Sequence, residues 1–225
     1  MLVRYASSVS VAVQGSLFDH SERRDLGAGA WVDMRSGWVE NPDELFDELS
    51  AAVPWRAERR QMYDRVLDVP RLVSFCDLTT GPAPHPAVAR LRRRLNDIYA
   101  GELGEPFTTA GFCLYRDGSD SVAWHGDRVG LPRSSSASSL GGIVDSGAGR
   151  SSTEDTMVAI VSLGATRLFA MRPREGGVAL RLPQSHGDLL VMGGSCQRTW
   201  QHAVPKTATA SGSRISIQFR PRGVR

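Results

Sequence analysis

From residue 106 to the end of the chain, hydrophobic positions occur in short runs separated by turns rich in glycine, proline and aspartate. Runs of about four to eight residues with β-branched and aromatic side chains are typical of strands. The pattern predicts eight strands, over 112–115, 121–127, 156–163, 166–172, 177–182, 188–192, 198–204 and 213–220. Eight strands of this kind favour a double-sheet jelly roll, in which a metal can lie at the open mouth between facing strands.

The first half of the chain contains two helical patterns. One helix is predicted to begin at Asn41-Pro42, because Asn can cap a helix and Pro fits its first position, and to end at Pro54. A second helix is predicted from His85-Pro86, with an apolar stripe formed by Val88, Leu91, Leu95 and Ile98. Short strands are expected over 30–34 and 72–78, so the fold class is α+β and mainly β. Residues 1–30 are small and polar, and they predict a flexible N-terminal arm.

Composition narrows the class of protein. The 225 residues are 41% hydrophobic and 23% charged, enough for one ordinary globular core. No run of 18 apolar residues is present, so we expect no membrane association. Three widely spaced cysteines predict reduced thiols and a cytoplasmic protein, which we expect to be a monomer. A net charge of +3 with a pI near 9.0 permits a polyanionic partner without requiring one.

His125, Asp127 and His202 form a candidate metal site. His125 and Asp127 are two residues apart in a predicted strand, so their side chains point to the same side. Two imidazoles and one carboxylate suit ferrous iron and leave coordination positions for a cosubstrate and dioxygen. A lone His-x-Asp also occurs by chance in core and turn positions. Arg214 strengthens the metal reading, because an oxygenase that oxidises 2-oxoglutarate needs a cation for the distal carboxylate.

Six segments, in order, resemble the AlkB family of iron(II)- and 2-oxoglutarate-dependent dioxygenases: Cys113–Arg116, Asp120–Asp127, Ser162–Arg167, His186–Met192, Trp200–Lys206 and Arg214–Arg220. The resemblance covers roughly residues 69–221, and its most specific part is the Arg-x-Ser-x-x-Phe-Arg ending. It implies a double-stranded β-helix core over 106–225, preceded by an N-terminal extension with a nucleotide-recognition lid over 31–105. A Ser- and Gly-rich loop over 133–152 follows the metal motif, either as an inert insertion or as a cover for the substrate.

The resemblance also implies an activity. The cofactors would be Fe(II), 2-oxoglutarate as cosubstrate, and O2. The reaction would remove N-alkyl lesions such as N1-methyladenine and N3-methylcytosine from DNA or RNA, with release of formaldehyde, succinate and CO2. The nucleic acid would be single-stranded, or a duplex with the target base flipped out. The alternative is a hydroxylase or demethylase of the same chemistry that acts on a protein or a small molecule.

Cosubstrate residues follow from the same resemblance. Arg214 and Arg220 share one face of the last strand but lie about 20 Å apart if it is extended. We therefore assign Arg214 to the distal carboxylate and place Arg220 nearer the metal. Tyr115 is expected to supply a hydroxyl. Cys113 stands where many members carry Asn, which removes an amide from this pocket.

The segment 55–63 is basic with aromatic residues at both ends. Taken alone, it fits a solvated face with packed rings better than a lid that stacks a base and meets phosphates. The resemblance implies a substrate lid just ahead of the barrel, and this position favours the lid. The candidate substrate residues are Met62, Tyr63, Arg71, Phe75, Trp124 and Arg128. Arg128 directly follows the metal Asp, where many family members carry a second acid, so the preferred base stays open.

Overall fold

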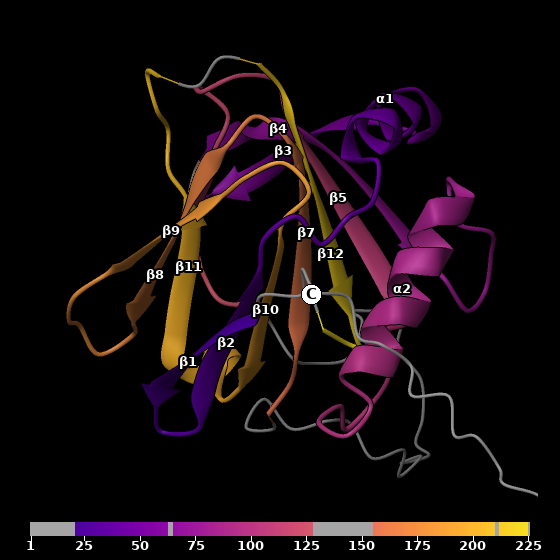
Figure 1. Cartoon of the computed structure of the whole chain (residues 1–225). Helices are drawn as coiled ribbons and strands as arrows, with labels where there is room; N and C mark the ends of the chain where they lie inside the picture. Colours follow the sequence, from indigo (N-terminus) through magenta and orange to yellow (C-terminus); the bar gives the residue numbers. More distant parts are fainter. Residues whose placement is uncertain (1–20, 63–64, 128–154, 210–211, 225) are drawn as a thin grey trace, which may run out of the picture.

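The computed structural model describes residues 21–62, 65–127, 155–209 and 212–224 (Figure 1). The helices are α1 (Pro42–Ala52), α2 (Pro86–Ile98) and α3 (Cys196–Thr199). The strands are β1 (Ser21–Gly27), β2 (Ala30–Arg35), β3 (Arg56–Met62), β4 (Arg65–Asp77), β5 (Thr109–Tyr115), β6 (Val122–His125), β7 (Val158–Gly164), β8 (Arg167–Pro173), β9 (Leu180–Gln184), β10 (Leu189–Gly194), β11 (Trp200–Val204) and β12 (Arg214–Arg220).

The strands form two antiparallel sheets. The larger has the order β1-β2-β10-β7-β12-β5-β4-β3, and the smaller has the order β6-β11-β8-β9. Figure 1 shows the small sheet on one side of the large sheet and helices α1 and α2 on the other. This arrangement confirms the predicted mainly-β, jelly-roll core.

The central strands of the large sheet are buried on both faces, because each face packs against a different layer. Ile215, Ile217 and Phe219 of β12 lie in the hydrophobic cluster that contains the apolar stripes of α1 and α2. The alternate residues of β12 face the small sheet, since side chains alternate along a strand. A second cluster fills the space between the sheets, with Ile160 from β7 and Phe169 from β8. The candidate site therefore lies between the sheets, away from the helices.

Most predicted elements are present within a few residues of their expected bounds. The eight strands expected after residue 106 correspond to β5–β12, and the two helices correspond to α1 and α2. The strand predicted over 198–204 begins only at Trp200, because Cys196–Thr199 forms the short helix α3.

The N-terminal expectations differ from the structure. Residues 21–27, expected within a flexible arm, form strand β1, which pairs with β2 through a tight turn at Gly27-Ala28-Gly29. This strand shows no hydrophobic pattern in the sequence because it lies at the exposed edge of the sheet. Its hydrogen bonds to β2 hold it in place, together with Arg23, which forms an ion pair with Glu102 and lies over the Trp31 ring. Residues 1–20 and the loop 133–152 lie outside the described residues.

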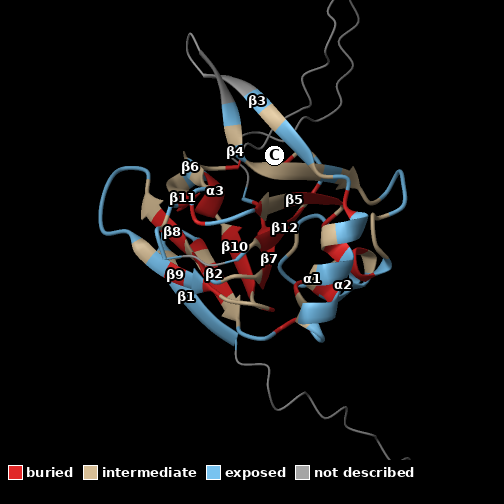
Figure 2. Cartoon of the chain, turned by 90° about the horizontal axis from the view of Figure 1, so that it is seen from above, coloured by how far each residue is buried: buried red, intermediate tan, exposed pale blue. Residues whose placement is uncertain are grey.

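The predicted boundary at residue 105 does not divide the large sheet. Strands β1–β4 flank β10, β7, β12 and β5 in one hydrogen-bonded ladder. The segment expected to be a lid is the β3–β4 hairpin, which projects from the edge of this sheet (Figure 2). In the described part of the chain, no helix is both long enough and apolar enough to span a bilayer.

A buried hydrogen bond ties the end of α2 to the large sheet. The Tyr99 hydroxyl donates to Asp33 Oδ2 over 2.6 Å, and both residues are almost fully buried. Burial, and then the bond to the Asp33 carboxylate, raise the pKa of Tyr99, so the phenol keeps its proton. Ser21 Oγ donates to the other oxygen of Asp33 from the exposed strand β1.

Tyr99→Phe is therefore expected to lower the free energy of unfolding by about 1–3 kcal/mol, because a buried carboxylate oxygen loses a donor. Ser21→Ala is the matched control, since it removes a donor that lies near solvent; we expect a smaller loss, about 0.5 kcal/mol. Chemical denaturation of both variants measures the difference. Equal losses would show that the buried bond is not the main tie between α2 and β2.

Candidate active site

Three side chains on neighbouring strands form the candidate metal site. His125 ends β6, Asp127 follows it by two residues, and His202 is the cross-strand partner of His125 on β11. Their potential ligand atoms all lie within 4.8 Å of one another, and the two imidazole ring centroids are 4.2 Å apart. Asp127 and His202 are buried and His125 is partly exposed. The fold thus brings together the three residues expected from the sequence.

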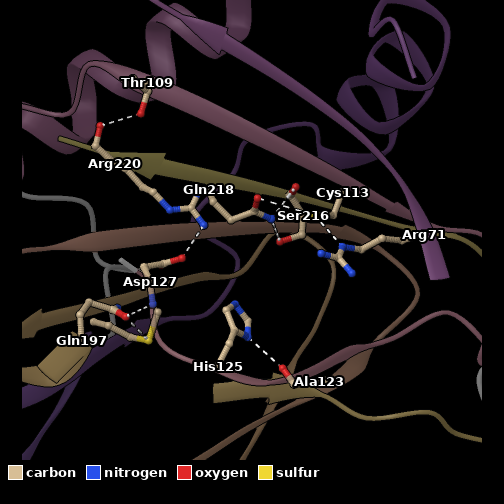
Figure 3. A network of polar contacts seen from close by, with 11 residues as sticks. Arg71, Thr109, Cys113, Ala123, His125, Asp127, Gln197, Ser216, Gln218 and Arg220 are labelled. Atoms are coloured by element: carbon tan, nitrogen blue, oxygen red, sulfur yellow. Dashed lines mark hydrogen bonds and ion pairs between the residues drawn. The ribbon is translucent and has the colours of Figure 1, made fainter. Parts of the chain in front are cut away.

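Both histidines are held in a state that can bind a metal ion through a ring nitrogen. His125 Nδ1 lies 2.9 Å from the Ala123 carbonyl oxygen, which can only accept, so in the neutral ring Nε2 carries the lone pair (Figure 3). His202 stacks on Phe169 with ring centroids 5.3 Å apart. Burial lowers the pKa of His202 to about 3, so its imidazole is neutral at neutral pH. A neutral imidazole is the form that binds a metal ion.

Asp127 is held at two points, and one carboxylate oxygen has no hydrogen-bond partner among the described residues. Its backbone N–H donates to Gln197 Oε1 over 3.0 Å, and its Oδ1 accepts from Arg220 Nη2 over 3.1 Å (Figure 3). Oδ2 is buried and has no partner among the described residues. Burial alone would raise the pKa of Asp127, but chiefly the charge and the hydrogen bond of Arg220 lower it overall, so the group is an anion. A buried anionic oxygen without a donor is suited to a cation.

The turn between His125 and Asp127 is packed against the loop that follows β8. Arg174 Nη2 donates to the Gln197 carbonyl over 3.2 Å, and its guanidinium lies where a side chain at Gly126 would begin. Glycine at position 126 therefore lets Arg174 and Gln197 close over the metal-binding turn.

A row of polar side chains on the large sheet faces this metal site. On β12, the alternate residues Arg214, Ser216, Gln218 and Arg220 point between the sheets. Gly111, Cys113 and Tyr115 are their neighbours on β5. A Cβ at position 111 would lie 3.0 Å from Arg220 Nη1, so this glycine lets Arg220 cross β5 towards Asp127.

Arg214 lies at the opposite end of this row from the metal site. Its side chain is 1% exposed, and its Nη2 donates to Ser162 Oγ over 2.8 Å. Its Nε and Nη1 are buried without a partner among the described residues. Burial lowers the pKa of Arg214, which reflects the cost of placing this cation out of water. Burial also raises the pKa of the adjacent Tyr115, which keeps a hydroxyl proton to donate.

Together, these residues can bind a metal ion at one end of the row and a dicarboxylate that reaches from it to the other end. One end offers two unused guanidinium donors and a phenol, and the other offers two neutral imidazoles and an unpaired carboxylate oxygen. The structure places Arg220 at the metal end, where its Nη2 contacts Asp127 itself. The sequence points to the residues at both ends, and their roles in binding a metal and a cosubstrate stay predictions.

The candidate substrate residues differ in where the structure places them. Arg71 reaches into the site, where its Nε donates to Cys113 Sγ over 3.3 Å and its Nη1 to the Ser121 carbonyl over 3.1 Å. Phe75 is 57% exposed on β4, and Trp124 is covered by the Arg172 guanidinium at 4.3 Å from its ring centroid. Met62 lies in β3 with its side chain not described, and Tyr63 and Arg128 fall outside the described residues.

Sequence reasoning did not identify Gln197, Arg174, Ser216 or Gln218. Ser216 and Gln218 could have been found, because they alternate in register with Arg214 and Arg220 along one strand. Gln197 and Arg174 come from a short helix and a loop whose position depends on tertiary packing, so no local pattern marks them.

Gln197→Leu is expected to weaken metal binding about 10- to 100-fold, because the metal-binding turn loses the acceptor of the Asp127 N–H. Gln201→Leu is the matched control: Gln201 is adjacent to His202, but its amide contacts Arg172 and none of the three potential ligands. Calorimetric titration with Mn(II) measures both. A similar affinity in the two variants would contradict the role of Gln197.

Comparisons with known proteins agree with this geometry. Residues 39–220 match the sequence profile of the 2OG-Fe(II) oxygenase superfamily. The chain is 30% identical over 209 residues to the alpha-ketoglutarate-dependent dioxygenase alkB homolog 3 of Homo sapiens; the match covers 82% of this chain and 65% of that protein. It is 32% identical over 219 residues to the DNA oxidative demethylase ALKBH2 of Arabidopsis thaliana; this match covers 87% of the chain and 68% of that protein. The chain thus spans slightly less than two thirds of the human relative.

Among solved structures, a 2OG-Fe(II) oxygenase family oxidoreductase from Burkholderia pseudomallei superposes with a TM-score of 0.53. The identity is 14% and the match covers 85% of each chain, so this likeness concerns the fold alone. The profile match extends over most of the two sheets and all three potential metal ligands. On this evidence, the chain belongs to the 2OG-Fe(II) oxygenase superfamily and is an AlkB-like member of it.

Proposed function

We propose that this chain is an Fe(II)- and 2-oxoglutarate-dependent oxidative demethylase of N-alkylated nucleic-acid bases such as N1-methyladenine and N3-methylcytosine. The products are formaldehyde, succinate, CO2 and the restored base. The observation that carries the proposal is a pair of unsatisfied groups between the two sheets: Asp127 Oδ2 beside His125 and His202, and Nε and Nη1 of Arg214, all without a hydrogen-bond partner among the described residues. Bound Fe(II) and 2-oxoglutarate supply the oxidation of the alkyl group by dioxygen.

The residues of this chain have separate tasks in the proposal. His125, Asp127 and His202 hold the metal, and Arg220 fixes the carboxylate of Asp127 in place. Arg214 and Tyr115 hold the distal carboxylate of the cosubstrate. The apolar cluster between the sheets keeps water from the floor of the cavity, which strengthens these charge interactions.

The substrate side of the cavity suits a nucleic acid. Phe75 of β4 is the cross-strand partner of Gly111, whose missing side chain would point at Arg220 and Gln218, so Phe75 lies on the site-facing side of the sheet. Arg71 lies on the same face of β4. Stacking on an aromatic ring contributes about 1–3 kcal/mol per base, and a cation nearby meets the phosphates. Relatives named DNA oxidative demethylase support a nucleic-acid substrate over a protein or a small metabolite.

The proposal includes a base presented on a single strand, or flipped from a duplex, because the ligand set lies inside the barrel. It also includes a monomer in the cytoplasm. Cys76, Cys113 and Cys196 are all free thiols, which supports a reducing compartment.

A panel of methylated oligonucleotides tests the activity. We expect formaldehyde and succinate in equal amounts from at least one methylated single strand and none from the unmethylated strand. His202→Ala is the control and should abolish both products, since an open three-ligand site loses a ligand. Succinate that depends on a protein or metabolite, with no formaldehyde from any methylated strand, would overturn the nucleic-acid assignment.

Arg214→Ala is expected to weaken binding of 2-oxoglutarate by roughly 2–5 kcal/mol, because a carboxylate loses a charge-assisted partner in a dry pocket. Arg214→Lys should lose less, since it keeps the charge without the planar two-point contact. Calorimetry with the Mn(II)-loaded protein measures both. An unchanged cosubstrate affinity in the alanine variant would show that Arg214 is not the anchor.

A further inference from the structure

Four polar side chains on three adjacent strands form a continuous chain of hydrogen bonds across the site-facing side of the large sheet (Figure 3). Arg71 of β4 contacts Cys113 of β5, Cys113 contacts Gln218 of β12, and Gln218 contacts Ser216. The first residue lies on the strand that carries the exposed Phe75, and the last lies two residues from Arg214. The chain therefore runs from the substrate side of the cavity to the cosubstrate side.

The chemistry of the groups gives this chain a single direction. A guanidinium can only donate, so Cys113 Sγ accepts from Arg71 Nε at 3.3 Å. A carboxamide oxygen can only accept, so the Cys113 thiol donates to Gln218 Oε1 at 3.8 Å. The orientation of the amide is fixed, because Gln218 Nε2 lies 3.0 Å from the Ser216 carbonyl oxygen, which needs a donor. The same Nε2 donates to Ser216 Oγ at 2.6 Å.

The direction of this hydrogen-bond chain leaves the hydroxyl proton of Ser216 at its end, without an acceptor among the residues that the structure describes. Ser216 Oγ accepts from Gln218, so its own hydroxyl proton points elsewhere, and it meets no acceptor among the described residues. Ser216 is 3% exposed and faces the cavity between Arg214 and Gln218. A buried donor without an acceptor costs stability unless a ligand supplies one. A carboxylate held by Arg214 would be such an acceptor.

The opposite end of the chain is open towards the substrate. Arg71 uses Nε for Cys113 and Nη1 for the Ser121 carbonyl, and its Nη2 has no partner within the described ranges. An anionic group that binds Nη2 shifts the whole guanidinium, because the three nitrogens are one rigid plane. Nε would then move relative to Cys113.

We propose that the Arg71–Cys113–Gln218–Ser216 chain couples the binding of nucleic acid to the binding of 2-oxoglutarate, with Gln218 as the positioning residue that orients the Ser216 hydroxyl. The substrate end of this inference rests on the proposed function, whereas the cosubstrate end depends only on the cavity. Coupling between two sites is reciprocal, so each ligand changes the affinity for the other by the same factor; we expect an increase.

Cys113 offers a matched pair of variants for the test. Cys113→Ser keeps a group that accepts from Arg71 and donates to Gln218, so the direction of the chain survives. Cys113→Ala removes both bonds with little change in volume. A purely structural role for Cys113 would make the two variants alike, whereas the coupling role separates them.

The experiment measures the dissociation constant of 2-oxoglutarate by calorimetry on the 225-residue chain loaded with Mn(II), with and without a saturating single strand that contains 1-methyladenine. We expect the oligonucleotide to tighten 2-oxoglutarate binding at least about five-fold in the original protein and in Cys113→Ser. We expect no tightening in Cys113→Ala. In the absence of oligonucleotide, Gln218→Leu should weaken 2-oxoglutarate binding about ten-fold, through loss of an oriented donor to a charged group.

Equal coupling in Cys113→Ala and Cys113→Ser, or no coupling in the original protein despite oligonucleotide binding, would overturn the proposal. An unchanged 2-oxoglutarate affinity in Gln218→Leu would overturn its cosubstrate end. If no methylated strand binds at all by fluorescence anisotropy, the proposed function and the coupling both fail, while the Gln218 measurement still decides whether Gln218 positions the cosubstrate.

Discussion

The site depends on strand β12 being covered on both faces by different layers. Its odd-numbered apolar residues, Ile215, Ile217 and Phe219, pack under α1 and α2, and its even-numbered polar residues face the small sheet. A shift of one residue in the register of this strand would exchange the two sets. The ladders to β5 and β7 fix that register at every position from Arg214 to Phe219. The position of every polar residue of β12 that faces the candidate site thus follows from the burial of the apolar half of the strand.

That arrangement places charges where water cannot reach them. Within the part of the chain that the structure describes, Arg214 has a hydrogen-bond partner at only one of its nitrogens, and Asp127 keeps one buried oxygen without a donor. Removing ionised groups from water is unfavourable unless partners replace the water. A metal at Asp127 and an anion at Arg214 would provide these partners, so binding of both would also stabilise the folded chain. The energetic cost of burying these charges and a high affinity for such ligands would then have the same origin.

The barrel was accessible from the sequence because its strands are buried and regularly spaced. The same reasoning missed β1, whose exposed residues show no hydrophobic period, and β3, whose basic residues resemble a solvated face. The three potential metal ligands could be predicted because His125, Asp127 and His202 stand within six ordered segments that resemble one family, although the His-x-Asp spacing alone is weak. Gln197 was not, because its contact with the Asp127 N–H joins positions 70 residues apart through a four-residue helix. Such contacts are set by packing, and no local pattern encodes them.

Position 113 shows how a departure from a family pattern changes meaning in three dimensions. The sequence suggests only a loss, since Cys113 stands where many AlkB-like proteins carry the amide of Asn. The structure places another amide beside it: Gln218 reaches across from β12 and contacts the Cys113 sulfur. A thiol is small enough to admit this longer side chain, and Gly111 next to it leaves room for Gln218 and Arg220 to cross β5. The polar function of the pocket is therefore redistributed over two strands, and an effect of Cys113 is intelligible only together with Gln218.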